Sequence, residues 1–520
     1  MATASELPID TSASAMDLAN SMFGNGIDVQ SAAFVGAANA SGIYSDGDAV
    51  APGATPSDTG VILSTGDVTS YTNSSGDVNT SAGTTTNHSL AGDSDLTSVA
   101  GATTFDAAVF TAEFIPDGST LTMQLVFSSE EYLEYVNSGF NDAVGVYVNG
   151  VKAELGFGDG DITINNINDQ SNVNLYLDNP ASADNFNTEM DGLTVTMTLK
   201  APVNPDALNT IKIAIADGGD AAYDSNLLIA GDSVQTQLIA QDDEFDISLS
   251  GSKNVDILDN DTSEPGSTLT ITHINNQPVS VGDVITLPSG ETVELIPDGT
   301  IQVTSDGSAS DNIFTYTVAD DLGNTDVGYV NVTTAPCFVA GTQIKTTRGL
   351  IPVEDLEPGT PVITKDHGIC SVTWVGTSTL PALGRFAPIE IAAGTFCDHE
   401  RTRVSPNHRV LLTGGRAQLL FSTSEVLVRA KDLVNHTTVR RIETDAPVTY
   451  VHILFNRHEI VWGDGLQSES YQPGDISMDA FDAQTQEEVF ALFPDLRCGG
   501  AYGPAARRAL KRFEALALIT

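Results

Sequence analysis

The sequence predicts a mainly β protein built from consecutive β-sandwich-like domains. Apolar and polar residues alternate over short runs such as 120–127, 143–148 and 210–215, and these runs are rich in β-branched side chains. Turn-forming pairs such as Asn149-Gly150 separate the runs. Short strands that are punctuated in this way favour antiparallel sandwiches over a parallel sheet.

Length and charge divide the chain into two segments. Its 520 residues carry a formal net charge of −47, and a chain of this length suits about three to four domains. Residues 1–336 hold four lysines and no arginine, for a net charge of −44, whereas residues 337–520 carry −3. All four cysteines and both tryptophans also follow residue 336. The acidity excludes a nucleic-acid partner. The sequence also lacks the run of about 18 apolar residues that a transmembrane segment needs.

The first segment is predicted to begin with a short amphipathic helix over 14–23 and to continue as strands. Three motifs follow in order: GVILSTG at 60–66, FSSEEY with FNDAVG within 127–145, and ADGGDAAYDS at 216–225. They resemble the bacterial choice-of-anchor L domain, to which we assign residues 5–238. The resemblance implies a secreted or surface protein with a cell-surface or matrix ligand that the motifs do not identify.

Acidic residues cluster inside these motifs. Ca²⁺ takes about six to eight oxygen ligands, which carboxylates and backbone carbonyls supply. The spacing is not that of an EF-hand loop, so two interpretations stay open: a calcium site, or a solvated acidic turn with an ordinary N-cap. The candidate calcium ligands are Glu130, Glu131, Asp142, Asp217, Asp220 and Asp224.

A second β unit is expected over residues 241–334. The motifs NVDILDND at 254–261 and FTYTVADD at 314–321 resemble bacterial cadherin-like (VCBS-like) domains. This implies one immunoglobulin-like sandwich, which serves either as a rigid spacer or in adhesion. Its acidic residues are further calcium candidates: Asp256, Asp259, Asp261 and Asp320.

The most specific motif begins at Cys337. CFVAGTQI occupies 337–344, VEDLEPGTPV occupies 353–362, and SPNH occupies 405–408. Together with residues 450–470, these blocks resemble the Hint domain that hedgehog proteins and inteins share, in its bacterial hedgehog-type subgroup. The resemblance covers residues 335–475 and implies an all-β fold with self-processing activity.

That resemblance implies cleavage at the Pro336–Cys337 bond. The Cys337 thiol attacks the carbonyl of Pro336, so that the peptide bond becomes a thioester in an N-to-S acyl shift. His408 is the candidate proton donor to the leaving amine, and Ser405 is the candidate partner of the scissile amide. The predicted catalytic residues are Cys337, Ser405, Asn407, His408 and His458.

Other features limit this chemistry. His452 and His458 both lie on a strand-like segment, where each has either a functional or a purely structural role. Inteins end in His-Asn, but residues 466–470 contain no asparagine, so full splicing is not expected. Cleavage needs no cofactor, and its acyl acceptor, water or a surface nucleophile, is not specified by the sequence.

The remaining cysteines and the tail are less informative. Cys370, Cys397 and Cys498 lack C-x-x-C spacing, so free thiols are expected rather than zinc ligands, although three pairings of the four cysteines remain formally open. In the tail, residues 476–520, helices are predicted over 480–493 and 504–518. The second helix is basic and amphipathic, which suits either packing on its own domain or a membrane surface.

The sequence as a whole predicts a secreted or surface protein that cleaves itself once, and so does not act as a turnover enzyme. The N-terminus has neither a basic nor an apolar signal region, so a signal-peptide-independent export route is expected. The alternative is a non-catalytic, calcium-dependent adhesin or surface-structural protein with a degenerate Hint domain.

Overall fold

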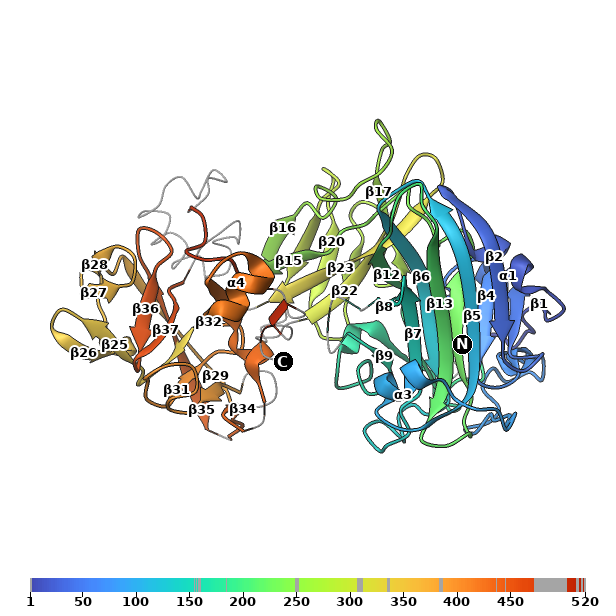
Figure 1. Cartoon of the computed structure of the whole chain (residues 1–520), viewed down its shortest axis with the longest axis horizontal. Coiled ribbons are helices and arrows are strands. Elements are labelled where there is room, and N and C mark those ends of the chain that lie inside the picture. Colours follow the sequence, from blue (N-terminus) through green and yellow to red (C-terminus); the bar gives the residue numbers. More distant parts are fainter. Residues whose placement is uncertain are drawn as a thin grey trace. The chain divides into compact units, whose positions relative to one another are not determined.

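The computed structural model describes residues 2–153, 155, 157, 160–183, 185–247, 252–305, 312–333, 337–382, 387–435, 437–444, 446–471, 503–510, 514–515 and 518. These residues are mostly β, which confirms the predicted fold class (Figure 1). They fall into two compact units, of which the first holds 1–243, 255–302 and 312–331 and the second holds 244–254, 303–311 and 332–520.

The described α-helices are short. Their bounds are α1 Ala15–Met22, α2 Gly47–Val50, α3 Ser94–Ala100 and α4 Gly415–Phe421. Helix α1 confirms the helix expected near the N-terminus. It begins with a capping box in which Ser14 and Asp17 satisfy each other's backbone amides.

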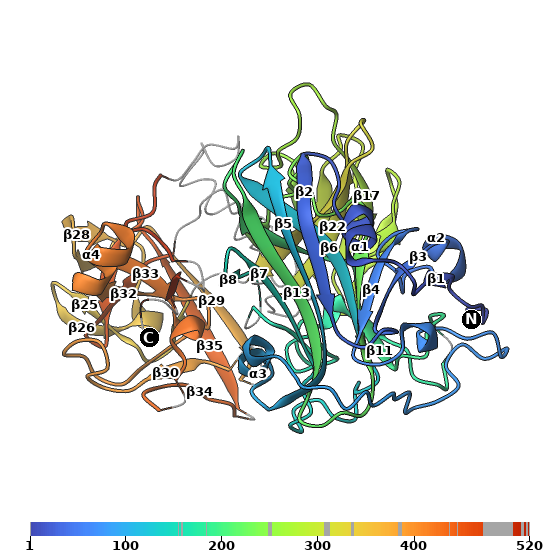
Figure 2. The same ribbon diagram turned by 45° about the vertical axis from the view of Figure 1, so that its right-hand side comes forward.

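Two antiparallel sheets build the N-terminal domain. The first sheet contains β1 Ile9–Asp10, β3 Ser41–Tyr44, β4 Gly60–Ser64, β14 Ser225–Ala230, β6 Thr120–Ser129, β11 Gly192–Thr194, β10 Tyr176–Asp178 and β12 Met197–Pro202. The second contains β2 Ile27–Val35, β5 Thr104–Pro116, β13 Asn209–Gly218, β7 Ala143–Val148, β8 Val151–Lys152 and β9 Ile162–Thr163 (Figure 2). Apolar side chains of both sheets, such as Phe110 and Phe127, share one buried core.

Two smaller sheets follow between residues 243 and 333. One contains β15 Asp243–Asp246, β23 Thr325–Thr333, β22 Asn312–Ala319, β17 Thr270–Ile274 and β18 Gln277–Pro278. The other contains β16 Ser252–Val255, β21 Ile301–Thr304, β20 Thr292–Leu295 and β19 Val284–Thr286. Part of this region packs on the N-terminal domain within the first unit, where Tyr329 OH donates to the Thr198 carbonyl at 2.8 Å and Thr198 Oγ1 donates to Asp326 at 3.0 Å.

The C-terminal β domain also consists of two sheets. The six-stranded sheet contains β29 Trp374–Pro381, β35 Pro447–Leu454, β24 Phe338–Val339, β31 Thr402–Val404, β30 Ile389–Ile391 and β34 Val439–Arg441. The eight-stranded sheet contains β28 Gly368–Ser371, β27 Pro361–Thr364, β25 Gln343–Thr346, β26 Gly349–Pro352, β36 Ile460–Gly463, β37 Leu466–Glu469, β32 Arg409–Thr413 and β33 Glu425–Arg429. Strand β24 therefore lies in the middle of its sheet, between β35 and β31.

The tail differs from its prediction where it can be compared. A helix starting at Pro504 is wrong, because residues 503–510 are not helical and Ala509 forms a parallel bridge with Leu427 of β33. Backbone hydrogen bonds between this segment and β33 take the place of the hydrogen bonds that a helix would form. The helix expected over 480–493 lies outside the described residues, as does Cys498. Within the described chain, no helix is both long and apolar enough to cross a membrane.

Candidate functional site

Strand register places Cys337 between two polar side chains. Cys337 directly precedes β24, whose Phe338 pairs with the last residue of β31 on one side and with Val451 of β35 on the other. Because both pairings are antiparallel, the residue before Phe338 comes to lie beside the residue after each partner. Those neighbours are Ser405 and His452.

Hydrogen bonds hold the Cys337 backbone to Ser405. The Cys337 amide nitrogen donates to Ser405 Oγ at 2.9 Å, and the Ser405 amide nitrogen donates to the Cys337 carbonyl at 3.0 Å. This Cys337 nitrogen belongs to the peptide bond that the sequence predicts to be cleaved. Pro336, on the other side of that bond, lies outside the described residues.

The Cys337 thiol contacts an imidazole. Its Sγ lies 3.1 Å from Nε2 and 3.3 Å from Nδ1 of His452, and both residues are buried. The ring of His452 is flanked by Trp374 and Tyr471, with ring centroids 6.5 and 5.4 Å away. The thiol and its histidine therefore meet in a site that is largely shielded from water.

His408 occupies a different position. Its ring packs edge-on against Phe338 with centroids 4.4 Å apart, and its backbone nitrogen donates to the Ser405 carbonyl at 3.1 Å. Neither ring nitrogen has a hydrogen-bond partner among the described residues. Burial lowers the pKa of His408 to about 4, even though Glu469 acts in the opposite direction. The imidazole is therefore neutral near neutral pH.

The buried imidazole of His458 lies between Ala506 and Glu469. Nδ1 accepts a hydrogen bond from the Ala506 amide at 3.1 Å, so the proton lies on Nε2, which is 3.3 Å from Glu469 Oε2. Arg409 donates its backbone amide to Glu469 Oε1 at 3.0 Å and its guanidinium to Oε2 at 3.3 Å. Burial raises the pKa of Glu469, but Arg409 and His458 outweigh it and hold this pKa at about 2. Asn407, in the turn between β31 and β32, is also buried.

His452 is not among the residues that the sequence predicts to be catalytic. Nothing in its local sequence distinguishes it from the other histidine on the same segment, His458. Only the pairing of β24 with β35 brings it to the thiol, and pairing partners more than 100 residues apart are not encoded in a local motif. The described cysteines Cys337, Cys370 and Cys397 are free thiols, as expected.

The predicted calcium ligands of the N-terminal domain separate into two groups. In the antiparallel β13–β7 pair Ala216 faces Ala143, so Asp217, near the end of β13, lies beside Asp142, which directly precedes β7. Asp142 is buried, and it accepts from the Gly218 amide at 2.9 Å and from Ser225 Oγ at 2.5 Å. Burial, with smaller contributions from Asp220 and Asp224, raises the pKa of Asp142 to about 7.

Glu131 belongs to the group around Asp142, whereas Glu130 does not. Burial, followed by the charges of Asp142 and Asp220, raises the pKa of Glu131 to about 9. The carboxylate of Glu130 instead accepts from the Thr84 amide at 2.7 Å, and burial raises its pKa to about 8. Within the described residues, no group of three or more His, Cys, Asp or Glu side chains is placed to hold a metal ion.

The acidic residues of the second domain are mostly used in turns. Asp256 accepts from the Leu258 amide at 3.2 Å, and Asp320 accepts from the Asn324 amide at 2.8 Å. Asp261 accepts from Tyr316 OH at 2.9 Å. The contacts of Asp256 and Asp320 are those of ordinary turn residues.

Family comparisons agree with this organisation. Residues 8–235 match the choice-of-anchor L domain, residues 232–333 match a bacterial Ig domain, and residues 336–475 match the Hint domain. The protein is therefore a multidomain chain that joins a choice-of-anchor L domain and an Ig-like domain to a C-terminal Hint domain. These matches confirm the predicted resemblances at the level of the domains, while the hedgehog-type subgroup stays a prediction.

Solved structures with partial similarity include two inteins. The splice-inactive variant of the AceL NrdHF class 3 split intein is 18% identical, with 26% of this chain and 97% of that chain covered and a TM-score of 0.19. The MchDnaB-1 intein is 19% identical, with 25% and 98% covered and a TM-score of 0.17. The M60 catalytic domain with two CBM51 domains of Clostridium perfringens ZmpB is 9% identical, with 71% and 34% covered and a TM-score of 0.15. No curated protein matches the chain.

Proposed function

We propose that the Hint domain cleaves the chain at the Pro336–Cys337 bond by an N-to-S acyl shift. The observation that carries this proposal is the arrangement at Cys337, where the scissile amide nitrogen is bonded to Ser405 and the thiol contacts His452. Hydrogen bonds to Ser405 fix both the nitrogen and the carbonyl of Cys337. The attacking sulfur and the leaving nitrogen therefore belong to one ordered residue.

In the first step, His452 accepts the proton of the Cys337 thiol and the thiolate attacks the carbonyl carbon of Pro336. The new carbon–sulfur bond gives a tetrahedral intermediate. The carbon–nitrogen bond then breaks, and the proton on His452 passes to the departing amine of Cys337. The product is a thioester between Pro336 and the Cys337 sulfur, and no cofactor takes part.

Ser405 and His408 have supporting roles in this mechanism. The hydrogen bond from the Cys337 nitrogen to Ser405 Oγ orients the scissile amide. Since its pKa of about 4 keeps His408 neutral, we assign the proton transfer to His452 alone and give His408 no proton to donate from the resting state. The contacts of His458 with Glu469 and Ala506 suit a structural role for that histidine.

Water or a surface nucleophile then attacks the thioester and takes the acyl group. This step frees the acidic segment 1–336 and regenerates the Cys337 thiol on the Hint domain. The choice-of-anchor L match supports a secreted or cell-surface location for the released segment. Full splicing is not part of the proposal, because residues 466–470 lack the asparagine that it needs.

Intact-mass spectrometry of the purified full chain tests the proposal. Incubation with dithiothreitol, which attacks thioesters, is expected to yield a fragment that ends at Pro336 and a second that begins at Cys337. Cys337→Ala should abolish both fragments. His452→Ala should slow their appearance by about 100-fold to 10,000-fold, as is typical for loss of a general base.

Cys370→Ala is the matched control, because it removes another free thiol from the same domain and should leave the rate unchanged. Persistence of the fragments in Cys337→Ala would show that the bond is cut by another agent. A wild-type chain that stays intact under reducing conditions contradicts the proposal and favours the alternative of a non-catalytic surface protein.

A further inference from the structure

We propose that the tail segment 506–510 is a positioning element for cleavage at Cys337. The docked segment holds the imidazole of His458, and through Glu469 it holds the turn 405–408, which carries Ser405. This inference rests on the proposed cleavage and gives it a requirement in the C-terminal tail.

The tail segment adds a parallel strand to β33, at the edge of the eight-stranded sheet. The Leu427 amide of β33 donates to the Arg508 carbonyl at 2.8 Å, and the Leu510 amide donates to the Leu427 carbonyl at 2.9 Å. The Leu510 side chain is 3% exposed and belongs to the core of the Hint domain. In strand addition, main-chain hydrogen bonds bind the segment and buried side chains select its register, so this segment has a defined position on the domain.

Two arginines of the segment anchor it further. The Arg507 guanidinium reaches Asp366 at 2.8 Å and Glu425 at 2.6 Å. These three side chains are 22–29% exposed, so the pairing is better shielded from water than a surface salt bridge. The Arg508 guanidinium lies over the Phe421 ring, 5.2 Å from its centroid. Polar and apolar contacts therefore support the same docked position.

Docking gives the buried His458 a fixed hydrogen-bond donor. The Ala506 amide donates to His458 Nδ1 at 3.1 Å, which selects the neutral tautomer with its proton on Nε2. Nε2 lies 3.3 Å from Glu469 Oε2, and both side chains are 0% exposed. Without the Ala506 amide, the proton of a neutral His458 can move to Nδ1. Two acceptors, Nε2 and the Glu469 carboxylate, would then face each other in a buried site.

Glu469 in turn holds the start of β32, directly after the turn 405–408. Its Oε1 accepts from the Arg409 amide at 3.0 Å. The turn is closed by the His408 amide, which donates to the Ser405 carbonyl at 3.1 Å, and Ser405 Oγ accepts from the Cys337 amide at 2.9 Å. A displacement of Glu469 is therefore passed through this short turn to the group that orients the scissile amide. Small misplacements at a reacting centre are costly in rate, even when their origin is remote.

Ala506→Pro in the full chain tests this role, because proline has no amide hydrogen to donate to His458. We expect it to slow the release of the fragment that ends at Pro336 by about fivefold to tenfold, the equivalent of one hydrogen bond to the scissile amide. Ala506→Gly is the matched control, since it removes the methyl group but keeps the amide, and its rate should stay close to that of wild type. Intact-mass spectrometry in dithiothreitol without denaturant measures the rates, and tryptophan fluorescence shows that each variant is folded.

A double variant separates a positioning role from a general loss of stability. If the tail acts through Ser405, Ala506→Pro should have little further effect in a Ser405→Ala background, because the two residues serve one interaction. A purely structural role would lower the urea midpoint of Ala506→Pro and leave the cleavage rate of the folded chain unchanged.

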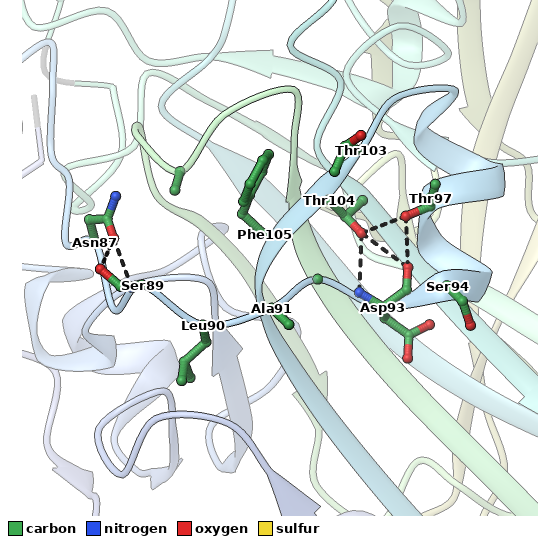
Figure 3. A pocket seen from close by; sticks show the side chains of 12 residues that line it. Asn87, Ser89, Leu90, Ala91, Asp93, Ser94, Thr97, Thr103, Thr104 and Phe105 are labelled. Atoms are coloured by element: carbon green, nitrogen blue, oxygen red, sulfur yellow. Dashed lines mark hydrogen bonds between the residues drawn. The ribbon is translucent and has the colours of Figure 1, made fainter.

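A second control lies in the first compact unit. There Thr97 Oγ1 donates to the Asp93 carbonyl at 3.0 Å beside a surface pocket of about 710 Å³, where Figure 3 shows Thr97, Thr104 and Asp93 together. Thr97→Ala removes this bond from the other unit and should leave the cleavage rate unchanged. If Thr97→Ala slowed cleavage as much as Ala506→Pro does, the effect would not be specific to the tail and the inference would be overturned.

The remaining outcomes separate this inference from the proposed cleavage. Equal rates for wild type and Ala506→Pro, or additive effects in the double variant, overturn the role of the tail and leave the cleavage proposal intact. A wild-type chain that does not cleave instead overturns the cleavage proposal and, with it, this inference.

Discussion

Replacement of Glu469 by glutamine should destabilise the Hint domain substantially. Glu469 lies on β37 opposite Arg409 of β32, and its carboxylate is buried with 0% exposure. It joins the Arg409 guanidinium to the His458 imidazole. Glutamine keeps the side-chain shape but removes the charge, so Arg409 loses its buried counterion.

The magnitude follows from the pKa of Glu469. Its value of about 2 in the folded protein lies below the ordinary 4.5. Folding therefore favours the ionised form by about 3 kcal/mol, which agrees with the cost of breaking a buried ion pair. Because the folded pKa is depressed, this contribution is complete above about pH 4.5 and is lost as the pH falls towards 2.

Tryptophan fluorescence during urea unfolding measures this effect in the intact chain. Trp374 and Trp462 are the chain's two tryptophans, and both belong to the Hint domain. At about pH 7 we expect Glu469→Gln to lose about 3 kcal/mol. The control Glu390→Gln should lose less, because the arginines that pair with Glu390 are about half exposed. A loss below about 1 kcal/mol for Glu469→Gln, or equal losses in the two variants, would refute the reasoning.

Two further predictions concern the same domain. Ser405→Ala should slow the release of the fragment ending at Pro336 by about tenfold, the equivalent of one hydrogen bond to the scissile amide, with little change in the urea midpoint; an unchanged rate would exclude that role. Acidification from about pH 6.5 to about 4 should cost the Hint domain up to about 3 kcal/mol, because the folded pKa of His408 is lowered and the unfolded chain binds a proton first. The urea midpoint measures this loss, and it should be smaller in His408→Gln; equal slopes would contradict the assignment.

The β architecture was predictable because its signals are local. Period-2 alternation and turn residues predicted strands at β6, β7 and β13, and Ser14 with Asp17 marks the start of α1. The amphipathic pattern after Pro504 predicted a helix, yet residues 503–510 hydrogen-bond to β33 instead. A local pattern does not reveal that an open strand edge is available, and this tertiary contact overrides the helical preference.

The sites were predictable as residue types but not as groupings. The SPNH block and the opening cysteine could be recognised from their resemblance to the Hint family, and Ser405 does bond the Cys337 nitrogen. His452 could not be chosen over His458 without knowing which strand pairs with β24. Likewise, Glu130 and Glu131 look equivalent in sequence, although they directly follow β6, where successive side chains point to opposite faces.

Strand register is the physical basis of the site at Cys337. Strand β24 has two residues, and a slip by one position would turn Cys337 away from both Ser405 and His452. Phe338 prevents the slip, since its buried ring packs over Gly463 of the other sheet, where an added Cβ atom would lie 2.8 Å from Phe338 Cε1. The same ring supports His408. One apolar side chain thus fixes the Cys337 thiol and a neutral imidazole at once, so the hydrophobic core of the Hint domain sets the geometry of this site.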